Sequence, residues 1–447
     1  MATLRPGMDF GMTEPHREAE LDNKPAGGDG SLLVLSLLSL LVGVGAGLVG
    51  AAFRLTLEQA DHLRNALISW AHGGGVAGML LVSAACAAGA AIAAWLVRRF
   101  SPHASGSGIP HVEAVLKQEL PPAPLSLLPV KFLGGALAIG SGLALGREGP
   151  SVQMGASVGH LVGKLFRRDW PDCRVLLAAG AGAGLATAFN APIAGAVFVL
   201  EELVRCFETR IALAALGASA TAMWVARLFI RAQPDFSVDP MAFTGSQVSI
   251  LFLVLGVVAG LVAVAYNRTL LGAIAAAGRL KRWPVELRAG LIGGAVGVLA
   301  WFAPDLVGGG EPLTQQTLSG LISASVLSIV LPLRFGLGAV SYATRTPGGL
   351  FAPLLVVGAQ VGLLFGVACR LLLPDLSTPP VAFAVVGMAA FFTGVVRAPV
   401  TGIVLIIEMT AGFTLLLPMV GACFTAMLVP ALLRNEPIYD SLRVPTP

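Results

Sequence analysis

The chain has 447 residues, 55% of them hydrophobic and 12% charged, with a mean hydropathy of +0.81. One soluble core cannot bury so much apolar surface, so the composition excludes an ordinary soluble protein and predicts an all-α membrane protein. The net charge is only +4, and the basic clusters at 164–174 and 279–288 fit loops that anchor a membrane protein, so we expect no nucleic-acid partner.

The first predicted elements are a polar tail and several uncharged runs. Residues 1–30 mix acids and bases with glycine and proline and lack an apolar core, so we expect a polar cytoplasmic tail and no signal peptide. The runs 31–53, 75–97 and 246–266 carry no charge, and each reaches the roughly 20 residues of a membrane-spanning helix. These runs predict a multi-span helical bundle.

Other apolar segments are short or interrupted. Only 13 uncharged residues separate Pro150 from Lys164, and the run 176–200 is interrupted by Asn190 and Pro192. We therefore expect broken and tilted helices with ends inside the bilayer. Irregular backbone at that depth is stable only where protein or a water-filled cavity surrounds it.

Three motifs occur twice in the same order, with a separation of about 202 to 207 residues. The pairs are 106–110 with 308–312, 150–159 with 353–362, and 191–201 with 398–408. This order predicts two related membrane halves, 31–235 and 245–447. Transporters often carry such repeats in inverted orientation with the substrate site at their interface, and we expect the same arrangement here.

Glycine-rich turns precede three predicted helices, at 106–110, 146–150 and 348–353. Each turn leads into a helix with proline in its first turn, where the missing N–H costs nothing. The first amides of a helix lack internal partners and carry partial positive charge, so such starts bind anions. One turn alone could be an ordinary tight turn, but three together favour convergence on one ion, and Ser107 would add a hydroxyl donor.

Together these segments resemble the signature motifs of the CLC chloride channel and transporter family, and of its prokaryotic chloride/proton antiporters in particular. The segments are Gly106-Ser-Gly-Ile-Pro110, Gly146-Arg-Glu-Gly-Pro150, Gly349-Leu-Phe-Ala-Pro353, Glu201-Glu202 after Phe189-Asn-Ala-Pro192, and Tyr439. The resemblance runs from about residue 31 to 442. It implies a homodimer with one pore per subunit and antiparallel halves within each subunit.

The resemblance also implies roles for individual residues. Glu148 corresponds to a gating carboxylate that occupies the outer anion site when charged and leaves it when protonated. Glu202 corresponds to an inner acid that passes protons toward Glu148. The implied chloride-binding residues are Ser107, Tyr439, Gly108, Ile109, Gly149, Leu350 and Phe351, with Arg147, Gly106 and Pro110 in support.

The motif around Glu148 also has a physical interpretation of its own. A charged side chain at the bilayer centre costs about 2.5 to 3.5 kcal/mol, so Glu148 should line an aqueous cavity or meet amide donors. There it can take the place of chloride at the same helix starts. A salt bridge between Arg147 and Glu148 is the alternative, but adjacent residues at a helix start point apart, so we expect Arg147 to fix the loop or supply positive field.

The predicted function is exchange of chloride for protons, with the family stoichiometry of about two chloride ions per proton. A passive voltage- or proton-gated chloride channel of the same family is the alternative. Family channels usually carry a neutral residue where this chain has Glu202, which favours the exchanger. Ser107 and Tyr439 favour chloride over nitrate. An unrelated transporter for an organic solute would need larger polar pockets.

Several further expectations complete the prediction. No nucleophile–base pair is present, the six histidines do not cluster and the five cysteines stand singly, so we expect no enzyme, metal site or cofactor. Lys131 either pairs with Glu113 or extends to the membrane interface, and Glu408, the counterpart of Glu201, suggests that Glu201 is structural. Only eight residues follow Tyr439, so we expect no C-terminal regulatory domain. The expected location is a bacterial inner membrane.

Overall fold

The computed structural model describes residues 29–230, 233–238, 246–280, 282–374 and 378–443. Throughout these ranges the regular structure is helical, apart from two isolated β-bridges. Eight of the helices are long and apolar enough to cross a membrane. The prediction of an all-α, multi-pass membrane protein is therefore confirmed, whereas the tail predicted at 1–30 lies almost entirely outside the described residues.

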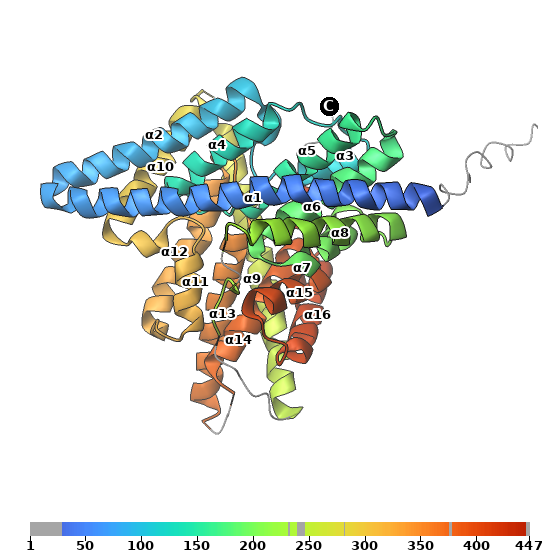
Figure 1. Cartoon of the computed structure of the whole chain (residues 1–447). Coiled ribbons are helices and arrows are strands. Elements are labelled where there is room, and N and C mark those ends of the chain that lie inside the picture. The colour runs from blue at the N-terminus through green and yellow to red at the C-terminus, as the bar shows by residue number, and fades with distance from the viewer. Residues whose placement is uncertain (1–28, 231–232, 239–245, 281, 375–377, 444–447) are drawn as a thin grey trace, which may run out of the picture.

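The helices follow one another in two series of eight (Figure 1). The first series is α1 (Asp29–Ala71), α2 (Val76–Phe100), α3 (Ile109–Leu116), α4 (Leu127–Gly140), α5 (Glu148–Leu165), α6 (Trp170–Phe189), α7 (Pro192–Phe198) and α8 (Thr209–Ala226). A π-helical turn, Val199–Leu203, continues α7.

The second series begins after the linker between the proposed halves. It is α9 (Ser246–Arg279), α10 (Val285–Phe302), α11 (Glu311–Leu318), α12 (Ala324–Tyr342), α13 (Phe351–Leu372), α14 (Pro380–Val396), α15 (Pro399–Thr410) and α16 (Leu416–Leu432), and the short α17 (Ile438–Ser441) follows it. The short helices α3 and α11 have 8 residues each and hold the same place in their series. This match supports the proposal that the chain consists of two related halves.

The runs 31–53 and 246–266 lie within α1 and α9, and the run 75–97 lies within α2 except for Gly75, which precedes the helix. However, α1 has 43 residues, which at 1.5 Å per residue is roughly twice the length that a membrane core requires. In Figure 1 α1 and α9 run in clearly different directions. These two helices cannot both run parallel to the membrane normal, so at least one of them is tilted, in agreement with the prediction of tilted helices.

The predicted break at Asn190 and Pro192 is present. Asn190 adopts a left-handed backbone conformation with φ of 53° and ends α6, and Pro192 begins α7. The second series repeats this geometry, because Arg397 has φ of 70° and Pro399 begins α15. Proline fits a first helical position because its N–H is not needed there.

Glycine contacts bring the helices that carry the site close together. A Cβ on Gly155 of α5 would lie 2.1 Å from the carbonyl oxygen of Gly180 on α6. In the second series, a Cβ on Gly358 of α13 would lie 2.7 Å from the carbonyl oxygen of Gly387 on α14. Small residues of this kind allow membrane helices to pack backbone to backbone, which holds α5 and α13 rigidly.

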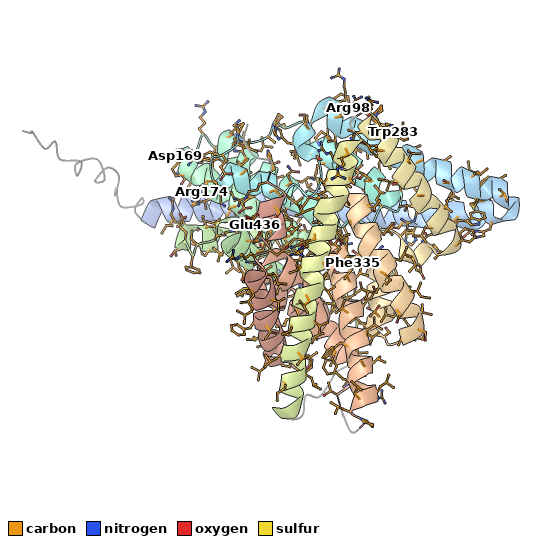
Figure 2. All side chains as sticks on the ribbon, turned by 180° about the vertical axis from the view of Figure 1, so that it is seen from behind. Arg98, Asp169, Arg174, Trp283, Phe335 and Glu436 are labelled. Carbon is orange, nitrogen blue, oxygen red and sulfur yellow. The ribbon has the colours of Figure 1, made fainter. Side chains whose placement is uncertain are left out.

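Contacts between the two series extend to the edge of the molecule. A Cβ on Gly293 of α10 would lie 2.7 Å from the carbonyl oxygen of Cys86 on α2, so these helices also pack closely. Arg98 at the end of α2 pairs with Glu286 of α10 at 2.5 Å. Figure 2 shows Arg98 near Trp283 at the same edge. The two series thus share one body.

Candidate anion and proton site

The three glycine-rich turns predicted to bind an anion meet in the interior of the molecule. The amide of Gly106 donates to the carbonyl of Thr346 at 3.1 Å, and the amide of Gly348 donates to the carbonyl of Gly106 at 3.0 Å. Gly146 and Gly349 exchange backbone hydrogen bonds of 2.8 and 2.7 Å. The turn before α13 therefore holds the turns before α3 and α5 at one point.

Glu148 is the first residue of α5 and is completely buried. One of its carboxylate oxygens lies 2.0 Å from the place that a Cβ on Gly146 would occupy, and 3.3 Å from the corresponding place at Gly349. The backbone amide of Ala352 faces the carboxylate. Among the described residues, neither oxygen has a hydrogen-bond partner in normal geometry. Glycine at 146 and 349 thus makes room for a buried carboxylate beside the first amides of α13.

Two buried hydroxyl groups lie near the start of α5. Ser107 and Tyr439 are both buried, and their hydroxyls face each other. Neither hydroxyl has a partner of normal geometry within the described part of the chain. A Cβ on Gly149 would lie 2.4 Å from the Ser107 hydroxyl, which places Ser107 against the start of α5. Two unpaired buried donors that converge on one point suit an anion.

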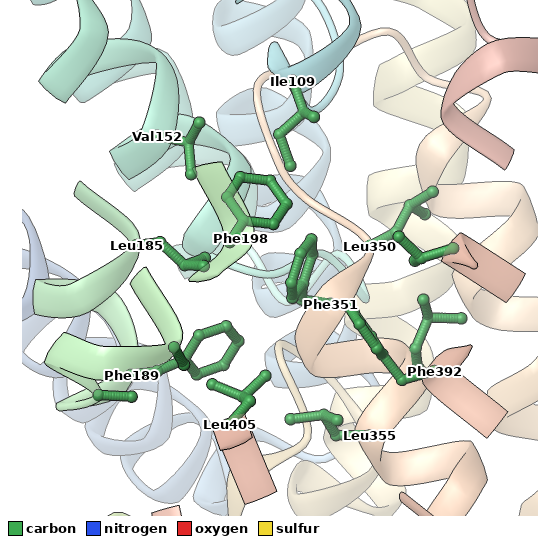
Figure 3. Close-up of a cluster of buried hydrophobic side chains, with 14 of the residues drawn as sticks. Ile109, Val152, Leu185, Phe189, Phe198, Leu350, Phe351, Leu355, Phe392 and Leu405 are labelled. Atoms are coloured by element: carbon green, nitrogen blue, oxygen red, sulfur yellow. The ribbon is translucent and has the colours of Figure 1, made fainter. Parts of the chain in front are cut away.

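Backbone amides add to these donors. The first helical hydrogen bonds of α3, α5 and α13 are donated by Val112, Ser151 and Leu354, at 3.0 Å each. The amides before them, including those of Ile109, Gly149 and Phe351, therefore have no partner within their helices. Figure 3 shows Ile109 and Phe351 in one buried cluster.

Local backbone geometry explains the glycine and proline of the first turn. Gly108 precedes α3 with φ of 86°, a conformation that favours glycine. A Cβ there would also collide with the amide oxygen of Gln153, at 2.2 Å. Pro110 occupies the second helical position, where no backbone donor is needed.

A sequence model of the voltage gated chloride channel family matches residues 89–431. The chain belongs to this family. The family resemblance predicted from the motifs is therefore confirmed, and the three glycine-rich turns that carried part of it meet in the structure.

Relatives of this CLC family member include exchange transporters. It is 38% identical to the H(+)/Cl(-) exchange transporter ClcA of Vibrio cholerae serotype O1 over 416 residues, which cover 91% of this chain and 88% of the relative. It is 37% identical to the H(+)/Cl(-) exchange transporter ClcA of Cronobacter sakazakii over 427 residues, which cover 93% of this chain and 90% of the relative.

Solved CLC structures have the same fold. A slow cyanobacterial Cl-/H+ antiporter superposes with a TM-score of 0.87 at 31% identity, covering 92% of this chain and 97% of that chain. A CLC-type fluoride/proton antiporter superposes with a TM-score of 0.78 at 23% identity, covering 93% of this chain and 98% of that chain. This likeness concerns the fold alone.

Glu202, the second acid predicted to carry protons in this CLC protein, lies in the π-helical turn after α7 and is 3% exposed. Arg205 approaches its carboxylate at 3.5 Å and also pairs with Asp440 at 2.9 Å and with Glu113 at 3.4 Å. Arg443 pairs with both Glu113 and Asp440. This network was not predicted from the sequence, because its members lie up to 330 residues apart along the chain.

Glu201 points elsewhere, although it is adjacent in sequence. Its carboxylate accepts hydrogen bonds from the amides of Val400 and Thr401 at the start of α15, at 3.0 and 2.6 Å. Glu408 at the end of α15 accepts in turn from Ala194 at the start of α7, at 2.7 Å. Each acid therefore caps a helix of the other proposed half, in agreement with a structural role for Glu201.

Arg147 contacts three other parts of the chain. Its guanidinium donates to the carbonyl of Ala188 at 2.8 Å and pairs with Glu311 at 3.0 Å and Asp235 at 3.4 Å. These contacts tie the turn before α5 to α6, α11 and the segment after α8, which supports the expectation that Arg147 fixes the loop. Asp235 and Glu311 were not identified from the sequence, since neither lies in a motif that implied such a role.

Three cavities are lined by residues of the predicted motifs. The Gly106 cavity, of about 440 Å³, is lined by Gly106 and Gly108 from the turn that carries the serine hydroxyl. The Arg147 cavity, of about 100 Å³, is lined by Gly146 and Arg147. The Glu202 cavity, of about 670 Å³, is lined by Glu202. In the described part of the chain, no group of three or more His, Cys, Asp or Glu residues could hold a metal ion.

Both expectations for Lys131 were wrong. Lys131 neither pairs with Glu113 nor extends to the membrane interface, because it is completely buried and donates to the carbonyls of Ala104 and Gly106 at 3.1 and 2.7 Å. Glu113 instead joins the network around Arg443. Main-chain carbonyls satisfy the lysine here, and a sequence motif does not reveal such partners.

Proposed function

We propose that this protein is a secondary active transporter that exchanges chloride for protons across a bacterial inner membrane. The observation that carries the proposal is the carboxylate of Glu148, buried and unpaired where the starts of α5 and α13 meet. Relatives named as H(+)/Cl(-) exchange transporters over about nine-tenths of the chain support it.

The proposed chloride site uses the donors that converge beside Glu148. The hydroxyls of Ser107 and Tyr439 and the free amides of Ile109 and Phe351 would hold the ion in a region from which bulk water is excluded. A carboxylate is itself an anion, so ionised Glu148 competes with chloride for these donors. Chloride that arrives repels the carboxylate charge and favours its protonated form, which couples the two ions.

Glu202 favours an exchanger over a passive channel. The acid is 3% exposed and borders its own cavity, apart from the Gly106 cavity that leads to the serine turn. Tyr439 lies within electrostatic range of both Glu148 and Glu202. We therefore propose that anions enter by the Gly106 cavity and leave by the Arg147 cavity, while protons enter at Glu202 and travel to Glu148.

An aromatic contact links the segments that carry the two acids. Phe198, four residues before Glu202, packs edge to face on Phe351, with ring centroids 5.7 Å apart. Figure 3 shows the two rings in one buried cluster. We propose that this apolar contact separates the two acids. Because no ionisable side chain lies in this ring contact, a proton would cross it on transient water. A passive channel would have no need of a second buried acid behind such a barrier.

Proteoliposomes provide the test. Purified full-length protein is reconstituted, an outward chloride gradient is imposed, and external chloride and pH are recorded together. Exchange predicts proton uptake against its own gradient, with about two chloride ions released per proton if the family stoichiometry holds. Chloride release without proton movement would support a channel, and the absence of chloride release would refute both readings.

We further propose that the protein is a homodimer. α7, α8, α15 and α16 expose large apolar side chains, including Ile193 (53% exposed), Val400 (52%) and Leu417 (71%), which a second copy could cover. Single-molecule photobleaching of labelled protein in liposomes tests this, with two bleaching steps expected. One step in most particles would contradict the dimer.

A further inference from the structure

Two basic side chains lie deep inside the helical bundle. Lys131 on α4 is completely buried, and Arg334 on α12 is 2% exposed. Every hydrogen bond that these side chains make to described residues goes to a main-chain carbonyl. Lys131 donates to Ala104 and Gly106 at 3.1 and 2.7 Å. Arg334 donates to the carbonyls of Leu306, Gly308 and Gly309, at 3.0 to 3.1 Å.

These two contacts are equivalent in the proposed halves. Gly106 precedes Lys131 by 25 residues, and Gly308 precedes Arg334 by 26. We call the hydrogen bonds from each basic side chain to these carbonyls a clamp. Each clamped turn leads into an eight-residue helix and ends in a left-handed glycine. This glycine is Gly108 before α3, with φ of 86°, and Gly310 before α11, with φ of 89°. The same device therefore occurs twice, once with lysine and once with arginine.

In the first half the clamp acts on the peptide that orients Ser107. The carbonyl of Gly106 accepts from both Lys131 and the amide of Gly348. The other side of this planar peptide, the amide of Ser107, donates to the hydroxyl of Tyr342 at 3.2 Å. With both sides of the peptide held, the backbone position from which the Ser107 side chain projects is fixed.

In the second half the same clamp holds a turn without a ligand side chain. Gly309 stands where the first half has Ser107, and its turn borders the Arg147 cavity. Arg334 thus serves a turn that contributes no hydroxyl. Arg334 is therefore a matched control for the function of Lys131 within the same chain.

We propose that Lys131 is a positioning residue for chloride binding, which orients the Ser107 hydroxyl by holding the carbonyls of Ala104 and Gly106. The proposal rests on the proposed chloride site. In this proposal Lys131 acts by donating hydrogen bonds to the turn at 104–106. The effects of replacing Lys131 and Ser107 on chloride affinity should therefore be coupled. A basic group that acted only through its long-range field would change affinity equally whether or not Ser107 has its hydroxyl.

The test is a double-mutant cycle read by isothermal titration of chloride into the purified full-length protein. Lys131→Met keeps the length of the side chain and removes its donors, and should weaken chloride binding roughly tenfold. In the Ser107→Ala background the same change should weaken binding by less than about threefold, because the hydroxyl that Lys131 orients is gone. Lys131→Arg, which keeps donors, should restore part of the affinity.

Arg334→Met is the control, and it should leave chloride affinity within about threefold of wild type. An unchanged chloride Kd in Lys131→Met, or an equal loss in both Ser107 backgrounds, would overturn the proposal. If Lys131→Met does not fold, the double-mutant cycle is repeated with Lys131→Arg in its place. Equal effects of Lys131→Arg on chloride affinity with and without the Ser107 hydroxyl would then overturn the proposal. Failure of the wild-type protein to bind chloride would instead refute the proposed function.

Discussion

At the scale of single residues, the carboxylate of Glu148 determines whether chloride movement is tied to protons. Replacing it with glutamine keeps the shape of the side chain and removes both its charge and its ability to carry a proton. A positioned side chain accelerates proton transfer by about 10² to 10⁴-fold, so Glu148→Gln should reduce proton transport to roughly one hundredth or less. Chloride release should persist when both ions are recorded in the same liposomes. Proton uptake at the wild-type ratio would contradict the assignment.

Glu201 and Glu202 give a test in which two neighbouring acids should behave differently. Both acids border the Glu202 cavity, but the Glu201 carboxylate accepts hydrogen bonds from the first turn of α15, whereas the Glu202 carboxylate meets only Arg205 among the described residues. Glu202→Gln should block proton uptake, again to about one hundredth, while Glu201→Gln should retain most of it. Both are measured as proton uptake driven by a chloride gradient. Equal effects of the two changes would mean that the proton route does not pass through Glu202.

The chemistry of the site could be predicted residue by residue where a side chain acts through a motif. Ser107 and Glu148 stand in glycine-rich turns whose purpose is visible in the sequence. Partners across long separations were not predictable, because Arg147 meets Asp235 and Glu311 only through the fold. The carbonyl partners of Lys131 were missed for a related reason, since any residue can provide a main-chain acceptor.

At the scale of elements, the reciprocal caps of α7 and α15 hold the two proposed halves together. Glu408→Ala removes a charged acceptor from the amides at the start of α7 and should cost about 1 to 2 kcal/mol of stability. The thermal unfolding midpoint in detergent measures this loss. Glu119→Ala, at an exposed turn, is the control and should leave the midpoint unchanged. An unchanged midpoint in Glu408→Ala would show that its hydrogen bonds add nothing.

Helix breaks were more predictable than helix extents. Proline and a residue tolerant of left-handed backbone mark the break at Asn190 and Pro192 in the sequence itself. The continuation of α1 to Ala71 was not predicted, because its second part carries charges that end an apolar run but do not end a helix. The π-helical turn that carries Glu201 and Glu202 was not predicted from the sequence.

At the scale of the whole molecule, the site exists only where the two series of helices touch. The repeated motifs predicted an interface between halves, yet they could not show that backbone hydrogen bonds cross it. Gly146 and Gly349 exchange two such bonds, so neither half contains a complete anion site. This arrangement explains why the signature motifs are spread over most of the chain.

Gly349 allows a direct test of this contact between the halves. A Cβ there would lie 2.8 Å from the amide nitrogen of Gly149 and 3.3 Å from the Glu148 carboxylate, so Gly349→Ala must push the two turns apart. We expect chloride affinity to fall at least about tenfold, together with the thermal midpoint. Gly336→Ala on α12 is the matched control, because a Cβ there meets nothing within 4 Å, and helix propensity predicts an equal or slightly higher midpoint. Wild-type chloride affinity in Gly349→Ala would mean that the halves bind the ion independently of their contact.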